Sequence, residues 1–169
     1  MEFKVYKPES WDDAAEKSLT ILYVADEKTV KPISFDKHEQ FISNWVLRIQ
    51  EGDFKKDDLE LVVDVLRNAG EVAIKTMEQN AMPYKHKEMV ELLCRKQHDY
   101  GHQNINNFGI LGLCIRMCDK FARIKNLQER GTEGKNESLY DSYLDVVGYA
   151  AIAMMYHDGS FQLKLERDK

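Results

Sequence analysis

The sequence predicts an all-α fold, an antiparallel helical bundle, and three observations support this. The 169 residues fit one domain, which at this length buries roughly 70% of its unfolded surface. Three prolines and nine glycines are few for a sandwich or barrel of many short strands. From residue 36 onward, apolar residues recur at the spacing of a helix face. We therefore expect a helical domain at 36–158, with an extension at 1–35 and a tail at 159–169.

The N-terminal extension has no single period. Phe3, Val5 and the run Ile21–Val24 predict short strands, whereas residues 11–19 predict a helical turn or two. We expect mixed structure over this part of the chain.

The first two helices of the domain have recognisable ends. Asp36 and Glu39 have the spacing of a capping box, and the apolar positions that follow predict a helix ending before Gly52. A second helix is expected from near Asp57 to about residue 79, either running through Gly70 or bending there.

Three further helices follow a break at residues 82–83. The first is expected to stop before Gly101, and a polar connection covers residues 99–109. The other two are expected at about 110–130 and 137–157. Because only residues 131–136 join them, they should form an antiparallel hairpin.

Composition excludes several classes of protein. The net charge of −5 argues against a general nucleic-acid coat and against a polybasic membrane patch. The longest apolar run, residues 146–156, is too short to span a bilayer, and the start of the chain does not have the pattern of a signal peptide. The three cysteines form no CxxC pair, which favours core packing. We expect a cytoplasmic protein with no membrane partner and no general nucleic-acid binding.

Three carboxylates recur four residues apart at the start of the last helix: Glu137, Asp141 and Asp145. A solvated acidic face is the ordinary explanation, but the uncharged residues 146–156 predict that this helix is buried and that the carboxylates enter a cleft. Two carboxylates about 5 Å apart repel by about 3 kcal/mol at an effective dielectric near 20. Either Mg²⁺ or a basic side chain of a neighbouring helix would offset that repulsion.

The preceding helix carries Arg116, Asp119, Lys120 and Arg123 on one face. Two interpretations are equally supported. Asp119 and Arg123 form an ordinary i,i+4 surface pair, or this face supplies a fourth carboxylate and three phosphate-binding cations. The polar connection adds side-chain amides beside Tyr100 and Phe108, which suit either turn geometry or recognition of a nucleotide base.

Several short motifs in residues 88–156 occur in a fixed order. They are Lys96-x-x-Asp99-Tyr100-Gly101, Phe108-Gly109, Arg116-x-x-Asp119-Lys120-x-x-Arg123 and Asn136-Glu137-Ser138-x-x-Asp141-x-x-x-Asp145-x-x-Gly148-Tyr149. This series resembles the phage-associated nucleotide modification associated domain family. That family in turn resembles the all-α, MazG-like nucleoside triphosphate pyrophosphohydrolases, which hold Mg²⁺ on two helices. The second motif here is one residue longer than theirs, and the first helix offers only Asp119.

The resemblance implies an Mg²⁺-dependent nucleotide pyrophosphohydrolase, or a related nucleotide-processing enzyme, probably best sought among phage proteins. The implied catalytic residues are Glu137 and Asp141, and the implied metal ligands are Asp119, Glu137, Asp141 and Asp145. Phosphate would be bound by Arg116, Lys120 and Arg123, and sugar or base by Lys96, Asp99, Tyr100 and Asn104. The alternative is a non-catalytic protein that binds a nucleotide or a host protein. The MazG-like relatives also imply a homodimer or higher oligomer.

Overall fold

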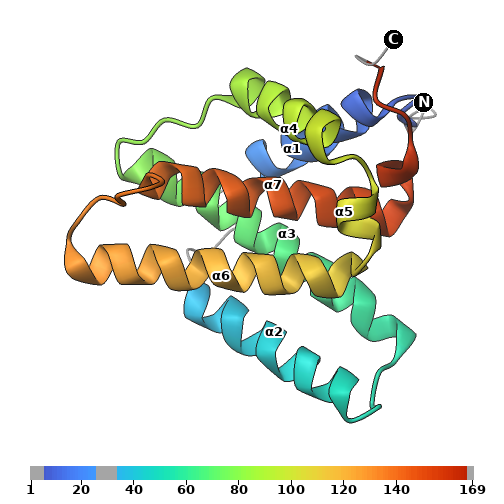
Figure 1. The fold of residues 1–169 in the computed structure, drawn as a ribbon, viewed down its shortest axis with the longest axis horizontal. Coiled ribbons are helices and arrows are strands. Elements are labelled where there is room, and N and C mark those ends of the chain that lie inside the picture. Colours follow the sequence, from blue (N-terminus) through green and yellow to red (C-terminus); the bar gives the residue numbers. More distant parts are fainter. Residues whose placement is uncertain (1–5, 26–33, 167–169) are drawn as a thin grey trace.

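The computed structural model describes residues 6–25 and 34–166, and in this part of the chain the regular structure is helical throughout (Figure 1). This confirms the all-α prediction. The helices are α1 (Trp11–Tyr23), α2 (Phe35–Gln50), α3 (Lys56–Gln79), α4 (His86–Tyr100), α5 (Gln103–Asn106), α6 (Gly109–Arg130) and α7 (Leu139–Asp158), followed by the 3-10 turn η1 (Ser160–Gln162).

Helix α7 occupies the centre of the bundle. It packs against α3, α6 and α1, and Figure 1 shows it between the α1–α4 pair on one side and α6 on the other. Its second half is apolar on every side, and such a helix is stable only when neighbours cover it all round. Val146, Val147, Ala150 and Ala151 are accordingly all fully buried.

Helix α3 runs straight through Gly70 and does not bend there. A Cβ at this position would lie 2.5 Å from Cβ of Ala150 on α7 and 3.3 Å from a methyl group of Leu22 on α1. Glycine is therefore needed because two helices approach α3 closely at this point.

The N-terminal segment departs from its prediction. Residues 21–23 form the last turn of α1, so the predicted strand at 21–24 is wrong, while the helical turns predicted at 11–19 are present. The hydroxyl oxygen of Ser10 accepts a hydrogen bond from the backbone N–H of Asp13 and caps this helix. Trp11, Leu19 and Leu22 are buried in the same core as α7. The predicted strand residues Phe3 and Val5 lie outside the described residues.

Two helix starts differ from the prediction. Helix α2 begins at Phe35 after the N-cap Ser34, so Asp36 lies in the first turn and is not a cap; its carboxylate pairs with Lys125 at 3.2 Å. Helix α7 begins at Leu139, after the N-cap Ser138, which leaves Glu137 in the connection before the helix. The spacing of side chains alone did not fix these starts, because a helix begins where a cap satisfies its first N–H groups.

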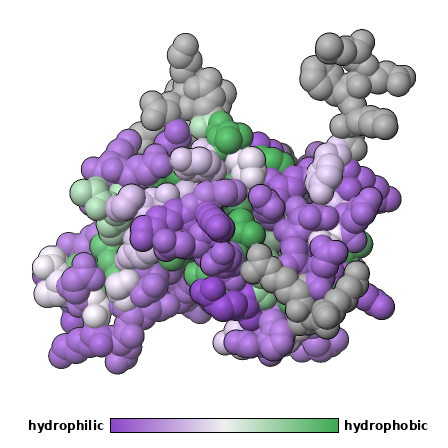
Figure 2. Space-filling model, turned by 90° about the horizontal axis from the view of Figure 1, so that it is seen from above, coloured by the Kyte–Doolittle hydropathy of each residue, from purple (hydrophilic) through white to green (hydrophobic). Residues whose placement is uncertain are grey.

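The face over α4 and α1 is mostly hydrophilic, and apolar residues show there only in small areas (Figure 2). Within residues 6–25 and 34–166, none of the helices combines the length and apolar character that a membrane crossing requires.

Candidate functional site

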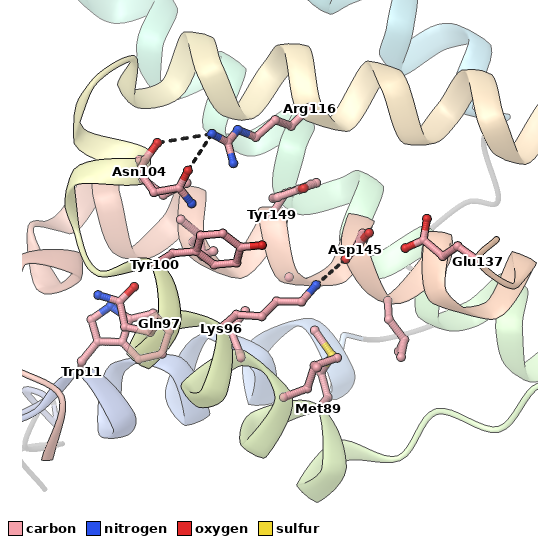
Figure 3. Close-up of a pocket in the computed structure, with 16 residues that line it drawn as sticks. Trp11, Met89, Lys96, Gln97, Tyr100, Asn104, Arg116, Glu137, Asp145 and Tyr149 are labelled. Carbon is pink, nitrogen blue, oxygen red and sulfur yellow. Dashed lines mark hydrogen bonds and ion pairs between the residues drawn. The ribbon is translucent and has the colours of Figure 1, made fainter. Parts of the chain in front are cut away.

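A pocket of about 340 Å³ lies between α1, α4, α5, α6 and α7. One part of its wall is apolar, with Met89, Leu93 and Ile152. The polar side chains that line it come from four helices and the connection before α7; they are Lys96, Gln97, Tyr100, Asn104, Arg116, Glu137, Asp145 and Tyr149 (Figure 3). The pocket thus joins apolar, aromatic, amide and charged groups in one place.

Asp145 is the centre of a network of ion pairs at one side of the pocket. Its two carboxylate oxygens lie 2.7 Å from the ammonium of Lys96 on α4 and 2.7 Å from that of Lys120 on α6. Lys120 also lies 3.2 Å from a carboxylate oxygen of Glu137. The side chain of Asp145 is 10% exposed, so screening by water is weak and the pairs hold three helix ends together.

The protonation states follow from these contacts. Burial by itself would raise the pKa of Asp145, but hydrogen bonds from Lys120 and Lys96 outweigh it and hold that pKa below its ordinary value. Burial would likewise lower the pKa of Lys120, but its bonds to Asp145 and Glu137 raise it overall. The network is therefore fully charged at neutral pH.

Arg116 lies apart from these pairs. One terminal nitrogen donates to the backbone oxygen of Asn104 at 3.3 Å and to the Oδ1 of the same residue at 2.9 Å (Figure 3). The described residues show no carboxylate paired with this guanidinium, which lines the pocket and is partly buried. It is thus a cation in the wall that is held in place by an amide and a carbonyl.

Arg123 has a different position from the one predicted. Its guanidinium donates to the backbone oxygens of Glu137 and Ser138 and to the hydroxyl of Ser142, and it does not line the pocket. A guanidinium that is committed to carbonyl groups holds the connection before α7 in place and so positions Glu137. The predicted role in binding phosphate does not fit this placement.

The four predicted metal ligands are not brought together. Asp141 is the third residue of α7, and its Oδ2 accepts from the backbone N–H of Ser138 at 3.0 Å while the hydroxyl of Ser138 accepts from the backbone N–H of Asp141. This capping box accounts for its position. Asp119 is exposed and lies outside the pocket. In the part of the chain that is described, no three His, Cys, Asp or Glu side chains are grouped to hold a metal ion.

The residues present therefore do not fit a cage of four carboxylates. Glu137 and Asp145 are the two that share the pocket, and both are paired with Lys120. Two carboxylates suit Mg²⁺ when the phosphates of a ligand supply further oxygens, which is how Mg²⁺ commonly enters nucleotide sites.

Of the residues predicted to contact sugar or base, Lys96, Tyr100 and Asn104 line the pocket. Asp99 does not; it is exposed and pairs with His98 at 3.2 Å. The reason is the helix period, because Asp99 lies three residues after Lys96 on α4 and turns away from the pocket.

The sequence analysis assigned no role to Trp11, Gln97 or Tyr149, which also line the pocket. Gln97 and Tyr149 lie within the quoted motifs, and Gln97 lies four residues after the apolar Leu93 on the same face of α4, which was a usable signal. No signal of this kind links Trp11 to the site, because only the packing of α1 brings it there.

Residues 96–156 match the family described as nucleotide modification associated domain 1. The match confirms the resemblance seen in the sequence motifs. No curated protein and no solved structure matches the chain. The matched segment contains the whole ion-pair network of Lys96, Lys120, Glu137 and Asp145, and Arg116 as well, whereas Trp11 and the apolar wall at Met89 and Leu93 lie before it.

Proposed function

We propose that this chain, whose residues 96–156 match nucleotide modification associated domain 1, binds a phosphorylated nucleoside in the pocket between α1, α4, α6 and α7. One observation carries the proposal. The matched segment contributes cations from two helices, two tyrosines and two amides to a single pocket that also has an apolar wall. Phosphate, sugar and base require these kinds of partner.

The phosphate end of the ligand belongs near Lys96, Arg116 and Lys120. These three cations face two carboxylates, Glu137 and Asp145, so the network has a surplus of positive charge. Arg116 is the best candidate for a first phosphate contact, because a guanidinium binds phosphate oxygens in a bidentate manner and no described carboxylate competes for it.

The tyrosines flank the middle of the pocket. Tyr100 is 65% exposed and Tyr149 is partly buried, and both line the cavity. Burial, together with the charge of Asp145, raises the pKa of Tyr149, so its hydroxyl is a neutral donor. An exposed ring beside a cationic wall is suited to contact with a sugar or a base.

A second candidate function is Mg²⁺-dependent hydrolysis of a nucleoside triphosphate between its α- and β-phosphates. The observation in its favour is that Glu137 and Asp145 share Lys120 in the same pocket. Mg²⁺, when bound, supplies charge that polarises a phosphate and activates a water. Glu137 and Asp145 would hold the ion, and Lys96 and Lys120 would then be released toward the phosphates.

The experiment that tests both candidates is calorimetry with deoxynucleoside triphosphates, with and without Mg²⁺, followed by chromatography of the nucleotides. Arg116→Gln should weaken binding by about tenfold or more, because it removes one charge-assisted phosphate contact. Arg95→Gln is the matched control, since Arg95 is an exposed cation on α4 outside the pocket. Its affinity should equal that of the parent.

The outcomes separate the candidates. Release of pyrophosphate establishes the hydrolase, and tight binding of unchanged nucleotide establishes the binding protein. Binding to no nucleotide, or equal affinities of Arg116→Gln and the parent, would overturn the placement of phosphate at Arg116. We also propose the homodimer that the sequence resemblance implied; light scattering that gives a mass near 19.7 kDa at micromolar concentration would disprove it.

A further inference from the structure

Two polar side chains lie in the apolar part of the pocket wall. Gln97 is 7% exposed and Trp11 is 0% exposed, and both line the cavity. The indole nitrogen of Trp11 is buried without a hydrogen-bond partner in the described chain, and the amide of Gln97 makes no hydrogen bond to another described residue. Buried polar groups in proteins are almost always paired, so both require an explanation.

These two residues lie together and apart from the ion pairs. They come from α1 and α4, which pack against each other, and Figure 3 shows both on the side of the pocket away from Glu137. The ammonium of Lys96 points the opposite way, toward Asp145. Because no part of Trp11 reaches the surface, a partner for its N–H must come through the pocket.

We propose that Gln97 and Trp11 form the base-recognition end of the pocket and that they select a pyrimidine nucleotide. This inference rests on the proposed function. The indole N–H is a donor only, and the amide of Gln97 offers one acceptor and one donor, in either order because the amide can turn over. Together they present a donor beside an acceptor–donor pair.

Both pyrimidines match this set completely. The edge of uracil or thymine has an acceptor at O2, a donor at N3 and an acceptor at O4. The edge of cytosine has acceptors at O2 and N3 and a donor at the 4-amino group. In each case O2 accepts from Trp11, and Gln97 pairs with the other two positions by adopting one of its two amide orientations.

Each purine leaves a group unpaired. Adenine has only a C–H at position 2, so it gives the indole N–H no acceptor when Gln97 pairs with N1 and the 6-amino group. Guanine places a 2-amino donor against a donor of Trp11 or of Gln97 in either direction. A site that hydrogen-bonds one ligand rejects a close analogue strongly when the analogue leaves a buried polar group unpaired.

The test compares binding of dUTP, dTTP, dCTP, dATP and dGTP to the parent, to Gln97→Met and to Trp11→Phe. The parent should bind the three pyrimidine nucleotides about tenfold or more tightly than the purine nucleotides. Gln97→Met keeps the size of the side chain and removes both hydrogen-bonding groups, so it should bring the two classes within about threefold. Trp11→Phe should lower pyrimidine affinity by a smaller factor.

Gln103→Met is the matched control, because Gln103 is an exposed amide outside the pocket. It should keep the preference of the parent. Gln97→Glu, which keeps the shape and loses the amide donor, serves as the second variant if Gln97→Met melts far below the parent, and it too should reduce the preference.

The result also separates this inference from the function on which it rests. Equal affinity of the parent for all five nucleotides, or an equal loss for both classes in Gln97→Met, would overturn the base-recognition role and leave nucleotide binding standing. Failure of the parent to bind any nucleotide would instead overturn the proposed function, and the inference with it.

Discussion

The two halves of α7 differ in chemistry although they form one continuous helix. The first half, Leu139–Asp145, borders the pocket and carries the carboxylates Asp141 and Asp145, one capping the helix and one paired with two lysines. The second half carries no charge up to Tyr156 and is enclosed by α1, α3 and α6. The difference shows where this bundle tolerates charge: only where cations of α4 and α6 reach the helix.

The enclosed half should be the more sensitive to substitution, and Gly70→Val tests this most strongly. The new Cβ would lie 2.5 Å from Cβ of Ala150, and both atoms belong to packed helices that cannot easily separate. We expect the free energy of unfolding to fall by about 3 kcal/mol in urea denaturation. Glu60→Val, at an exposed position of the same helix, should change it by about 0.5 kcal/mol or less. Equal effects of the two variants would contradict close packing at Gly70.

In the polar half, Asp145→Asn should have the next largest effect. It leaves Lys96 without its carboxylate and Lys120 with only Glu137. We expect a loss of about 1–3 kcal/mol in the free energy of unfolding, less than for a completely buried pair because Lys96 is exposed. Asp119→Asn is the control at an exposed position on α6 and should be nearly neutral. A more stable Asp145→Asn would mean that repulsion among carboxylates, and not pairing, dominates at this site.

Acid should remove the difference between the parent and Asp145→Asn. The pKa of Asp145 is lowered in the folded protein from 3.8, so its contribution is complete well above pH 3.8 and is lost as the pH falls through the folded value. The pKa of Lys120 is raised from 10.5, so its contribution is lost only above that value. Urea denaturation of both proteins should give a constant difference at neutral pH that shrinks in acid. A difference that already disappears at neutral pH would show that Asp145 is not the charged partner.

Asp141→Ala should have the smallest effect of these substitutions. It removes the capping-box acceptor for the backbone N–H of Ser138, which is worth about 1 kcal/mol, and Asp141→Asn should cost less because an amide oxygen still accepts that bond. The melting temperature should fall equally in EDTA and in Mg²⁺. If Asp141 were a metal ligand, Asp141→Asn would melt at or above the parent temperature in EDTA and would lose the stabilisation that Mg²⁺ gives the parent.

The sequence determined the helices themselves. The apolar spacing in α2, α3, α4, α6 and α7 is local information, since residues three and four apart share a face wherever the helix lies. The uncharged run after Asp145 also predicted that α7 is buried, which the structure confirms. The motifs between Lys96 and Tyr149 were sufficient for the family resemblance, and the match at residues 96–156 confirms it.

The tertiary structure decided what each polar side chain does. Glu137, Asp141 and Asp145 are equally spaced in the sequence, yet α7 starts at Leu139, so the first lies before the helix, the second caps it and the third enters the pocket. That start depends on Ser138 and on the guanidinium of Arg123, which holds the preceding carbonyls. Trp11 joins the site only because α1 packs against α4 and α7. Periodicity fixes a residue's face on its own helix, whereas its partners depend on which helices meet there and at what register.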